Sequence, residues 1–294
     1  MAKRFETIAL IGKYQSPDVA EAVLHIAEFL RNRGHAVLIE QGTASSIGVA
    51  GGFPVASYDA IGATADLALV LGGDGTMLNT ARRLAEHAVP LVGVNQGRVG
   101  FLTDISRDDA IARLSEMFEG KYSEESRFML SAEVLRGGER VYQTLALNDV
   151  VVNKGELGRM IEFDVSIDDD FVYTQRSDGM IVTTPTGSTA YALSANGPIL
   201  HPSIGAIALV PLCPHALTAR PVTLPDTCRI DINLLSPHDA RVHFDGQARF
   251  DARAGDCVRI TRSPYAIRLL HPENYSYFAM LREKLHWSAV PRLP

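Results

Sequence analysis

A group of glycines around one carboxylate is the most unusual chemical feature of the sequence. Gly72-Gly-Asp-Gly-Thr76 directly follows the apolar run Leu67–Leu71. Glycines let a backbone approach a ligand closely and point its N–H groups inward, which suits a phosphate group. A carboxylate in that place repels phosphate unless it accepts a proton from an attacking hydroxyl or holds Mg²⁺. Asp74 is therefore the candidate catalytic group. The alternative is a tight turn in which Asp and Gly are simply turn formers.

The pattern around these glycines predicts a strand, a turn and the start of a helix. Leu67–Leu71 is short, apolar and bounded by glycine, as in a strand that is buried on both faces. After Thr76 the apolar residues take up helical spacing, at Met77, Ala81 and Leu84. The N-terminus of such a helix carries a partial positive charge, which favours a bound phosphate.

The first part of the chain is predicted to form an α/β domain. Strands over residues 8–12 and 36–39 alternate with a helix that starts at Ser16-Pro17, which makes a β-α-β unit. A further strand over residues 90–95 ends in a second glycine turn, at the edge where open α/β sheets bind ligands. Residues 42–52 are rich in Gly, Ser and Ala and are expected to form a loop.

The pattern changes after a predicted helix over residues 108–118. From Arg127 onward, short β-like segments separated by turn residues are typical of an antiparallel sandwich. These segments cover residues 129–135, 141–152, 162–167, 171–176, 179–183, 229–234, 240–244, 257–261 and 266–270. Residues 275–287 return to helical spacing, with Phe278, Leu281 and Leu285 on one face. The expected fold class is α/β plus all-β. The expected parts are an α/β domain over residues 1–110, a β-sandwich domain over residues 111–274, and a helical segment, residues 275–294, that packs back on the first domain.

The stretch Thr183-Thr-Pro-Thr-Gly-Ser-Thr-Ala-Tyr-Ala-Leu-Ser194 is the second candidate binding segment. Pro and Gly make a turn, after which Ser188 or Thr189 is expected to cap a short helix. Free N–H groups and hydroxyls at a helix start bind anions or the edges of purines, and Tyr191 offers a face on which a base can stack. An ordinary capped helix after a turn is the alternative.

Several polar residues flank or interrupt the predicted strands. Asn148-Asp149 breaks an apolar run, so this pair either forms a bulge or faces a ligand. Arg159, Arg176 and Asp178 flank the same strands, and an arginine fork engages two phosphate oxygens at once, although isolated surface charges have the same appearance. Asp245-Gly246 is typical of a two-residue hairpin turn.

Composition restricts the function classes. The chain has 294 residues, of which 46% are hydrophobic and 21% charged, which is ordinary for a soluble globular protein. The longest apolar runs are far shorter than the ~20 residues of a membrane span. A net charge of −6 argues against nucleic acid as a partner. The three cysteines are widely spaced and form no CxxC pair, which argues against a zinc site or a disulfide framework. Free cysteines favour a reducing compartment, and we expect a cytoplasmic location.

The loop Gly72–Thr76 resembles one shared by NAD kinases, diacylglycerol and sphingosine kinases, and 6-phosphofructokinases. The other motifs distinguish among these families, because they match the NAD kinase series in order and spacing over nearly the whole chain. They are Asn95–Leu102, Asn148-Asp149, Arg176–Gly179, Thr184–Tyr191, Gly197-Pro198 and Asp245–Gln247. Many members carry Asn-Glu where this chain has Asn148-Asp149, and Asp149 keeps the carboxylate. The chain therefore resembles the NAD kinase family.

This resemblance implies transfer of a phosphoryl group from ATP to the 2′-hydroxyl of the adenosine ribose of NAD. It implies Mg²⁺ or another divalent metal, without assigning metal ligands. The implied fold is an N-terminal Rossmann-like α/β domain, a C-terminal β-sandwich and a C-terminal helix that returns to the first domain. The implied partners are NAD, ATP and further copies of the chain in a homodimer or homotetramer, with neither nucleic acid nor membrane. A lipid kinase with the same glycine loop and a non-catalytic NAD- or NADP-binding regulator are the alternatives.

The resemblance also assigns roles to individual residues. Asp74 would be the catalytic carboxylate. The phosphate loop would consist of Gly72, Gly73, Gly75 and Thr76. The NAD-binding residues would be Asp74, Gly75, Asn148, Asp149, Arg159, Arg176, Asp178, Thr189, Ala190, Tyr191, Ala192, Leu193, Ser194 and Gln247.

Overall fold

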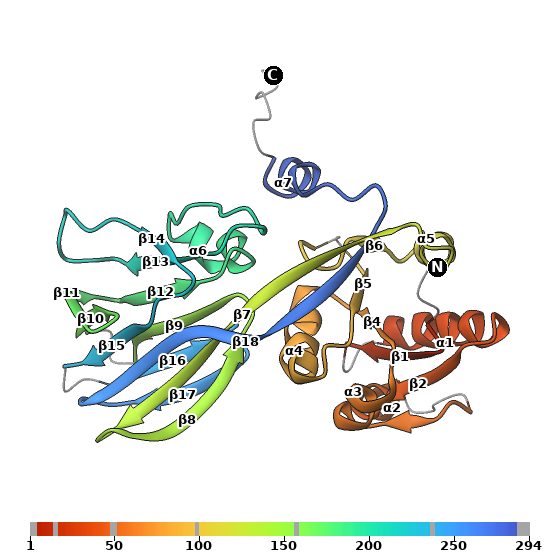
Figure 1. The fold of residues 1–294 in the computed structure, drawn as a ribbon, viewed down its shortest axis with the longest axis horizontal. Coiled ribbons are helices and arrows are strands. Elements are labelled where there is room, and N and C mark those ends of the chain that lie inside the picture. Colours follow the sequence, from red (N-terminus) through yellow and green to blue (C-terminus); the bar gives the residue numbers. More distant parts are fainter. Residues whose placement is uncertain are drawn as a thin grey trace. The chain divides into compact units, whose positions relative to one another are not determined.

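The structure is a computed structural model that describes residues 5–13, 17–47, 52–97, 100–155, 159–235 and 239–286. Contacts divide the chain into two units, residues 1–126 with 267–294 and residues 127–266 (Figure 1). The long strands β7 (Tyr122–Arg136) and β18 (Asp256–Pro272) contribute residues to both units. The division into residues 1–110, 111–274 and 275–294 stays a prediction.

The first unit is built on a parallel sheet with the strand order β5-β4-β1-β2-β3, and β6 pairs with β5. The strands are β1 (Thr7–Gly12), β2 (Ala36–Glu40), β3 (Val55–Ala56), β4 (Leu67–Leu71), β5 (Leu91–Asn95) and β6 (Ile105–Ser106). The end of β18 runs parallel to β5, with Leu269 opposite Leu91. β2 and β3 lie on one side of β1, and β4 and β5 on the other. The strand order therefore reverses between β1 and β4, the kind of position where α/β sheets bind ligands.

Helices cover both faces of this sheet. The helical elements of this unit are α1 (Pro17–Asn32), α2 (Gln41–Ile47), α3 (Tyr58–Thr64), α4 (Asp74–Leu84), the 3₁₀ turn Ala85–His87, α5 (Ala110–Phe118) and α7 (Tyr277–Leu285). α1 and α5 share a buried cluster with Leu10, Leu69 and Val92 of the strands. The alternate strand residues Ala9 and Val70 are equally buried, and α4 and α3 contact β4 and β2. This two-sided burial agrees with the unbroken apolar run from which β4 was predicted.

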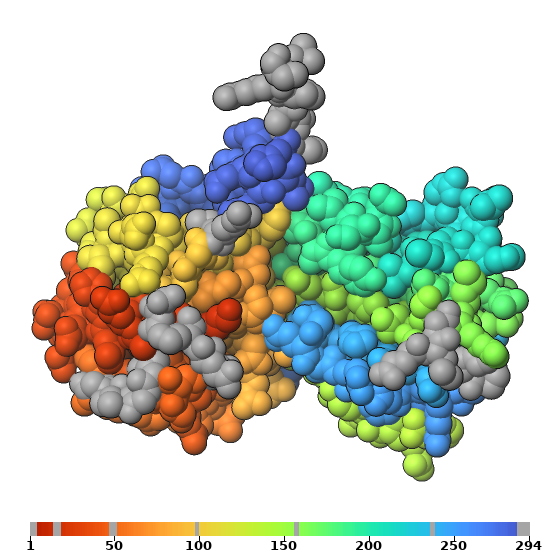
Figure 2. All heavy atoms as spheres, turned by 180° about the vertical axis from the view of Figure 1, so that it is seen from behind, coloured from red at the N-terminus to blue at the C-terminus, as the bar shows by residue number. Residues whose placement is uncertain are grey.

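The C-terminal helix of the first unit begins at its cap, where the Ser276 hydroxyl accepts a hydrogen bond from the Ala279 N–H at 3.3 Å. Leu281 is buried, as expected, but Phe278, which was expected to share its face, is 52% exposed. Just before α7, Leu270 packs in one cluster with Leu114 of α5. Figure 2 shows the blue C-terminal residues beside the yellow residues of the same unit.

The prediction of a loop over residues 42–52 is wrong where the structure describes this segment, because α2 occupies Gln41–Ile47. The Glu40 carboxylate accepts hydrogen bonds from the Gly42 N–H at 2.8 Å and from the Thr43 N–H at 2.7 Å. These bonds satisfy N–H groups that the first turn of a helix leaves open, which offsets the poor helix propensity of glycine. α3 was not predicted either, and the expected cap of α1 at Ser16 lies outside the described residues.

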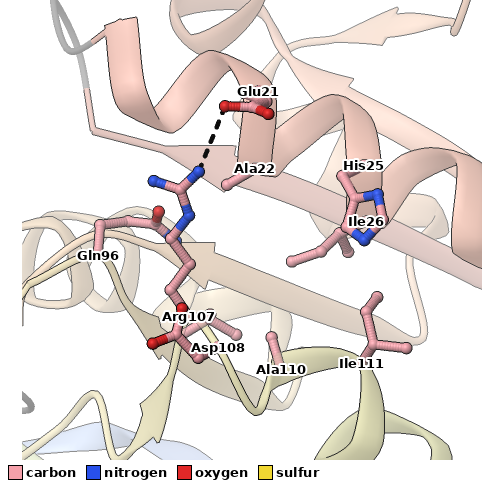
Figure 3. Close-up of a pocket in the computed structure, with 10 residues that line it drawn as sticks. Glu21, Ala22, His25, Ile26, Gln96, Arg107, Asp108, Ala110 and Ile111 are labelled. Atoms are coloured by element: carbon pink, nitrogen blue, oxygen red, sulfur yellow. Dashed lines mark hydrogen bonds and ion pairs between the residues drawn. The ribbon is translucent and has the colours of Figure 1, made fainter.

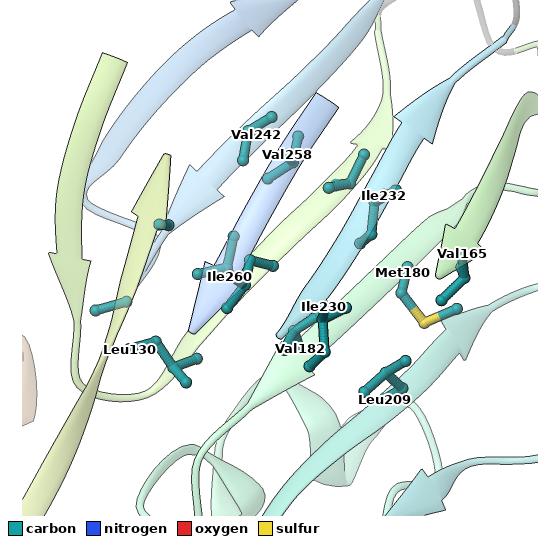
Figure 4. Close-up of a cluster of buried hydrophobic side chains, with 14 of the residues drawn as sticks. Leu130, Val165, Met180, Val182, Leu209, Ile230, Ile232, Val242, Val258 and Ile260 are labelled. Atoms are coloured by element: carbon teal, nitrogen blue, oxygen red, sulfur yellow. The ribbon is translucent and has the colours of Figure 1, made fainter. Parts of the chain in front are cut away.

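The second unit is a sandwich of two sheets. One contains β11-β10-β15-β18 with β7 and β8, and the other has the order β14-β13-β12-β9-β16-β17. The strands are β8 (Glu139–Ala146), β9 (Asp149–Lys154), β10 (Ile161–Ile167), β11 (Asp170–Ser177), β12 (Gly179–Thr183), β13 (Ala206–Leu212), β14 (Val222–Pro225), β15 (Ile230–Leu234), β16 (Ala240–Phe244) and β17 (Ala248–Ala252). Figure 4 shows Val182 and Val242 of one sheet in the same buried cluster as Ile230 of the other. The predicted sandwich core is therefore present.

Several features of this unit differ from the sequence expectation. The segment 141–152, expected to be one strand, forms the end of β8 and the start of β9. Residues 257–261 and 266–270 were expected to be separate strands, but they belong to the single strand β18. β13 and β14 were not predicted. The expected hairpin at Asp245-Gly246 joins β16 to β17, and both residues have positive φ angles, 53° and 65°. That is the geometry for which Asp-Gly is the favoured pair.

Candidate active site

Asp74 is the first residue of α4, and the extended Gly73 precedes it as the N-cap. The Asp74 Oδ2 atom accepts a hydrogen bond from the Phe101 N–H at 2.8 Å. Oδ1 accepts one from the Leu102 N–H at 3.0 Å and a third from the Thr103 hydroxyl at 3.2 Å. The orientation of the carboxylate is therefore set by the segment that follows the second glycine turn.

Two glycines let this segment come close to Asp74. A Cβ atom on Gly100 would lie 2.0 Å from Asp74 Oδ1, so a side chain there would force one of the two to move. A Cβ atom on Gly93 of β5 would lie 2.6 Å from the Leu102 carbonyl oxygen. The second glycine turn, expected from the sequence to face a ligand, thus also serves to hold the candidate catalytic group. Arg98 and Val99 of that turn lie outside the described residues.

The turn before α4 uses part of its backbone within the protein. The Gly72 N–H donates to the Val94 carbonyl at 2.9 Å, and the Thr76 N–H donates to the Gly73 carbonyl at 3.0 Å. A Cβ atom on Gly72 would lie 2.5 Å from the Thr76 hydroxyl, whereas nothing lies within 4 Å of the Cβ position of Gly73. The open side of the turn is therefore at Gly73.

In the second unit, the stretch 183–194 packs directly on Asn148. The Asn148 carbonyl accepts hydrogen bonds from the Thr184 N–H at 2.9 Å and from the Thr183 hydroxyl at 3.0 Å. The Thr184 hydroxyl donates to the Leu147 carbonyl at 2.6 Å. The structure therefore brings together two motifs whose contacting residues lie 35 and 37 positions apart.

The hairpin residue Asp245 holds the same segment from the other side. Its carboxylate accepts hydrogen bonds from three successive N–H groups: Leu147 at 3.0 Å, Asn148 at 2.7 Å and Asp149 at 3.2 Å. Asp245 is 8% exposed, so these bonds compensate for the burial of a carboxylate. The Asp245-Gly246 motif is therefore more than a turn, because it fixes the backbone of Asn148-Asp149.

These contacts build a cavity of about 350 Å³ on the second unit. It is lined by the predicted residues Asn148, Asp149, Ala190 and Tyr191, together with Val151, Asn153, His243, Asp245 and Gly246. Tyr191 is 47% exposed, so a face of its ring is available for stacking. The volume lies at the small end of the range of ligand pockets and suits one part of a dinucleotide.

The pKa values of two residues that line this cavity, Asp149 and His243, are shifted toward the uncharged form. Burial raises the pKa of Asp149 to about 7, and the neighbouring charge of Asp245 adds to the rise. Burial also lowers the pKa of His243, and the charges of Arg249 and Arg241 lower it further. Within the described part of the chain, the buried Oδ1 atoms of Asn148 and Asn153 have no hydrogen-bond partner. The side chains that line the cavity therefore carry two unpaired acceptors.

Other predicted residues lie outside this cavity. Tyr191 and Ser194 line a second, adjoining hollow of about 520 Å³. Arg159 and Arg176 are exposed, and Asp178 forms an ion pair with Lys154 at 2.8 Å. Ala192 is fully buried in a cluster with Val151. Thr189, Leu193 and Gln247 line neither hollow.

The expected cap of the helix after Pro185 is wrong. A 3₁₀ turn covers Gly187–Thr189, α6 covers only Tyr191–Ser194, and neither has a side-chain cap. The Ser188 hydroxyl instead donates to the Pro185 carbonyl at 2.7 Å and accepts from the Leu200 N–H at 3.0 Å. The Ser188 side chain therefore links the turn at Pro185 to the backbone of Leu200.

Five residues that line the cavity were not among the predicted site residues: Val151, Asn153, His243, Asp245 and Gly246. Asn153 shares a strand face with Asp149 and Val151, because side chains alternate along β9, and that periodicity was a usable signal. His243 lies opposite Val151 in β16, far away in the sequence. Nothing local in the sequence indicates that pairing.

A separate hollow of about 250 Å³ lies on the first unit (Figure 3). Arg107 and Glu21 form an ion pair across it at 3.4 Å. Gln96, His25 and Asp108 also line it, and its mixed charges define no ligand class. Within the described ranges, no three His, Cys, Asp or Glu side chains gather in a way that could hold a metal ion. None of the described helices is long and apolar enough to cross a membrane.

Family models match both parts of the chain. Residues 8–122 match the ATP-NAD kinase N-terminal domain, and residues 147–271 match the ATP-NAD kinase C-terminal domain. The chain belongs to the NAD kinase family. The resemblance inferred from the motifs is therefore confirmed.

Curated members of this family are similar over their full length. An NAD kinase of Aromatoleum aromaticum is 78% identical over 294 residues, which cover 100% of this chain and 98% of the relative. An NAD kinase of Thiobacillus denitrificans is 52% identical over 283 residues, which cover 96% of this chain and 97% of the relative.

Two solved structures of the family resemble this one. A yeast NADH kinase complexed with NADH has a TM-score of 0.90 at 25% identity and covers 99% of this chain and 91% of its own. An NAD kinase from Archaeoglobus fulgidus in complex with ATP has a TM-score of 0.76 at 26% identity and covers 95% and 98%. The fold expected from the family, an α/β part, a mostly-β part and a C-terminal helix, is confirmed.

Proposed function

We propose that this member of the NAD kinase family transfers the γ-phosphoryl group of ATP to the 2′-hydroxyl of the adenosine ribose of NAD, with Asp74 as the general base. Membership of the family supports the kinase activity and its acceptor. The observation that carries the role of Asp74 is its carboxylate, placed at the start of α4 and oriented by the N–H groups of Phe101 and Leu102.

The reaction needs one proton acceptor. As the 2′-oxygen forms its bond to the γ-phosphorus, the O–H bond breaks and the proton passes to the Asp74 carboxylate. The bond from the γ-phosphorus to the bridging oxygen breaks, and ADP leaves with that electron pair. A positioned base typically contributes a factor of ~10²–10⁴. The rest of the catalysis is positioning and charge stabilisation, to which the N-terminus of α4 is suited.

The adenosine half of NAD is assigned to the cavity of the second unit. Tyr191 would stack on the base, and the amide oxygens of Asn148 and Asn153 would accept hydrogen bonds from an amino group. Asp149 with its raised pKa is suited to a polar group of the ribose or base. The remaining family positions, Gly75, Thr189, Ala190, Ala192, Leu193, Ser194, Arg159, Arg176, Asp178 and Gln247, would complete the dinucleotide site.

A divalent metal is proposed to enter with ATP. Mg²⁺ usually keeps several waters and is bound by one or two carboxylates together with substrate phosphates. The metal's ligands in this chain stay unassigned, and within the described residues no three His, Cys, Asp or Glu side chains gather that could hold the ion by themselves. Such an ion neutralises charge that develops on the phosphates during transfer.

Assembly and location are proposed on the family and on composition. A homodimer or homotetramer is expected, in which the exposed Arg159 and Arg176 act at or near a subunit boundary. Sedimentation should then show an oligomer, and activity should fall on dilution through its dissociation. A fully active monomer would contradict this. The cysteines Cys213, Cys228 and Cys257 are free, which supports a reducing compartment such as the cytoplasm.

The test is NADP formation from NAD, ATP and Mg²⁺. The wild-type chain should form NADP, and Asp74→Asn should lower kcat by at least about 100-fold while NAD affinity stays within a few-fold. Asp59→Asn is the matched control, because Asp59 is an exposed aspartate in the first turn of α3. A non-catalytic NAD-binding regulator would bind NAD and form no NADP, and a lipid kinase would phosphorylate a lipid instead. Asp74→Asn with kcat within threefold of wild type would show that the base lies elsewhere.

A further inference from the structure

A chain of hydrogen bonds runs from the end of β5 to the Asp74 carboxylate. The Gly97 N–H donates to Asn95 Oδ1 at 2.7 Å. Asn95 Nδ2 donates to the Thr103 hydroxyl oxygen at 2.8 Å, and that hydroxyl lies 3.2 Å from Asp74 Oδ1. Asn95 is 3% exposed and Thr103 is fully buried, so solvent does not compete for these bonds.

The direction of this chain is fixed at its start. A backbone N–H can only donate, so the Asn95 atom that it contacts must be the amide oxygen, and the other atom must be the NH₂ group. That NH₂ group donates to the Thr103 oxygen. A hydroxyl has a single proton, and with its oxygen accepting from Asn95 that proton is left to point at Asp74 Oδ1.

The two carboxylate oxygens of Asp74 are therefore not equivalent. An ionised carboxylate has about four lone-pair sites, two on each oxygen. Within the described residues, Oδ1 accepts from both Leu102 and Thr103, whereas Oδ2 accepts only from Phe101. Both sites of Oδ1 are filled, and one site of Oδ2 is open.

We propose that Thr103, held by Asn95, is a positioning residue that blocks Oδ1 and leaves Oδ2 as the oxygen of Asp74 that takes the proton of the substrate hydroxyl. This inference rests on the proposed function of Asp74. Without the Thr103 hydroxyl, the carboxylate keeps its bonds to Phe101 and Leu102 but loses its third anchor, so its rotation about the Cβ–Cγ bond is less restricted and Oδ1 also gains an open site. The open lone pair then no longer points in one direction, and a small misplacement of a reacting group can cost about 10²-fold in rate.

The test compares Thr103→Val with Thr103→Ser. Valine has nearly the same shape but no hydroxyl, so it should lower kcat by roughly 10–100-fold while the KM for NAD stays within threefold. Serine restores the hydroxyl and should return kcat to within about threefold of wild type. Rescue by serine, with the loss confined to kcat, is a result that a purely structural role would not give.

Thr80→Val is the matched control. Thr80 is a fully buried threonine of α4 whose hydroxyl has no hydrogen-bond partner among the described residues. Thr80→Val makes the same exchange of a hydroxyl for a methyl group, in the helix that begins with Asp74, without breaking a hydrogen bond. Its kcat should stay within twofold of wild type. A loss in Thr80→Val as large as in Thr103→Val would show that any buried threonine change in this unit disturbs the site, and would overturn the proposal.

The remaining outcomes also decide. If wild type forms NADP and Asp74→Asn does not, but Thr103→Val keeps kcat within twofold, the positioning role is wrong and the proposed function stands. A rise in the KM for NAD that accounts for the whole loss would place Thr103 in binding and overturn the role as well. If wild type forms no NADP, the proposed function itself fails.

Asn95→Asp carries the test if Thr103→Val does not fold, as judged by circular dichroism. The new side chain keeps the acceptor for the Gly97 N–H but cannot donate to Thr103. The Thr103 proton then turns away from Asp74, so kcat should fall at least tenfold with the KM for NAD within threefold. A folded Asn95→Asp variant with kcat within twofold of wild type would contradict the proposal.

Discussion

Gly187 lies so close to Asn148 that a Cβ atom on Gly187 would stand 2.2 Å from the Asn148 carbonyl oxygen. The same oxygen accepts hydrogen bonds from Thr183 and Thr184. The backbone before Tyr191 and the backbone before Asp149 are therefore parts of one packed unit. The segment 183–194 and the pair Asn148-Asp149 therefore depend on each other for their position in the fold.

Gly187→Ala should damage the NAD site of the second unit. The new methyl group must push the loop away from Asn148, which changes the position of Tyr191 relative to Asn148 and Asp149. We expect a loss of stability of about 1–3 kcal/mol and a clear rise in the KM for NAD. Thermal unfolding and steady-state kinetics measure the two effects.

Gly205→Ala is the milder comparison for Gly187→Ala. Its added Cβ would come no closer than 3.1 Å to a neighbouring heavy atom, the Oδ2 atom of Asp226. It should leave the KM for NAD near the wild-type value. Equal kinetics in Gly187→Ala and wild type would show that the loop has room to shift without changing the cavity.

Tyr191→Ala should weaken NAD binding. The ring lines the cavity and is 47% exposed, so truncation removes a stacking face rather than a core side chain. Stacking on an aromatic side chain is worth ~1–3 kcal/mol per base, so the KM for NAD should rise by roughly one to two decades. Tyr191→Phe keeps the face and should change little. An unchanged KM in the alanine variant would remove Tyr191 from the site.

The local pattern predicted most elements of the first unit because they are set by short-range periodicity. The apolar run Leu67–Leu71 and the helical spacing after Thr76 were enough to predict β4, the glycine turn and α4. α2 could not be found in this way. Its start depends on the Glu40 carboxylate, which replaces the usual capping residue by accepting from Gly42 and Thr43.

The site was predicted as a set of residues but not as an arrangement. Asp245 was read as a hairpin residue, and its three bonds to the backbone of residues 147–149 depend on strand pairing about 100 residues apart. The bonds from Phe101 and Leu102 to Asp74 are long-range in the same sense. The spacing of residues in the sequence does not indicate such contacts. The glycines that allow the close approach can be recognised in the sequence, but not the residues that they approach.

Asp149 should make the stability of the protein depend on pH. Burial first, and the charge of Asp245 second, raise its pKa to about 7, so the folded state holds this proton over a range where the unfolded state has released it. Stability should therefore fall as the pH rises from about 4 through 7. Asp149→Asn should remove this part of the dependence and gain thermal stability over wild type more at pH 8 than at pH 5. Asp170→Asn, at an exposed site in β11, should leave the pH dependence of stability unchanged. If thermal stability varies with pH in the same way in Asp149→Asn and in wild type, the expectation is contradicted.

His271 should also make the stability of the protein depend on pH, but in a higher pH range than Asp149. Burial lowers its pKa, but the carboxylates of Asp104, at 2.9 Å, and Glu125, at 3.3 Å, outweigh burial and raise it above the usual value. Tyr275 stacks on the ring with centroids 3.9 Å apart. The pairing of protonated His271 with these carboxylates should contribute fully to the stability of the fold below about pH 6.5. This contribution should disappear as the pH rises through the raised pKa of His271. His271→Gln should thus lose more thermal stability at pH 6 than at pH 9, unlike the exposed His25→Gln, and an equal loss at both values would show that packing alone is affected.

Gly100→Ala should impair catalysis more than binding. The added Cβ would lie 2.0 Å from Asp74 Oδ1, so either the carboxylate or the segment that carries Phe101 and Leu102 must move. Both movements break the hydrogen bonds that orient Asp74, and kcat should fall by at least about tenfold while NAD affinity, measured by calorimetry, stays within a few-fold. Gly97→Ala is the comparison from the same turn, because its Cβ would meet nothing closer than Asn95 Oδ1 at 3.9 Å, and it should lose much less. A folded Gly100→Ala variant with kcat within threefold of wild type would show that the orientation of Asp74 by this segment does not limit the reaction.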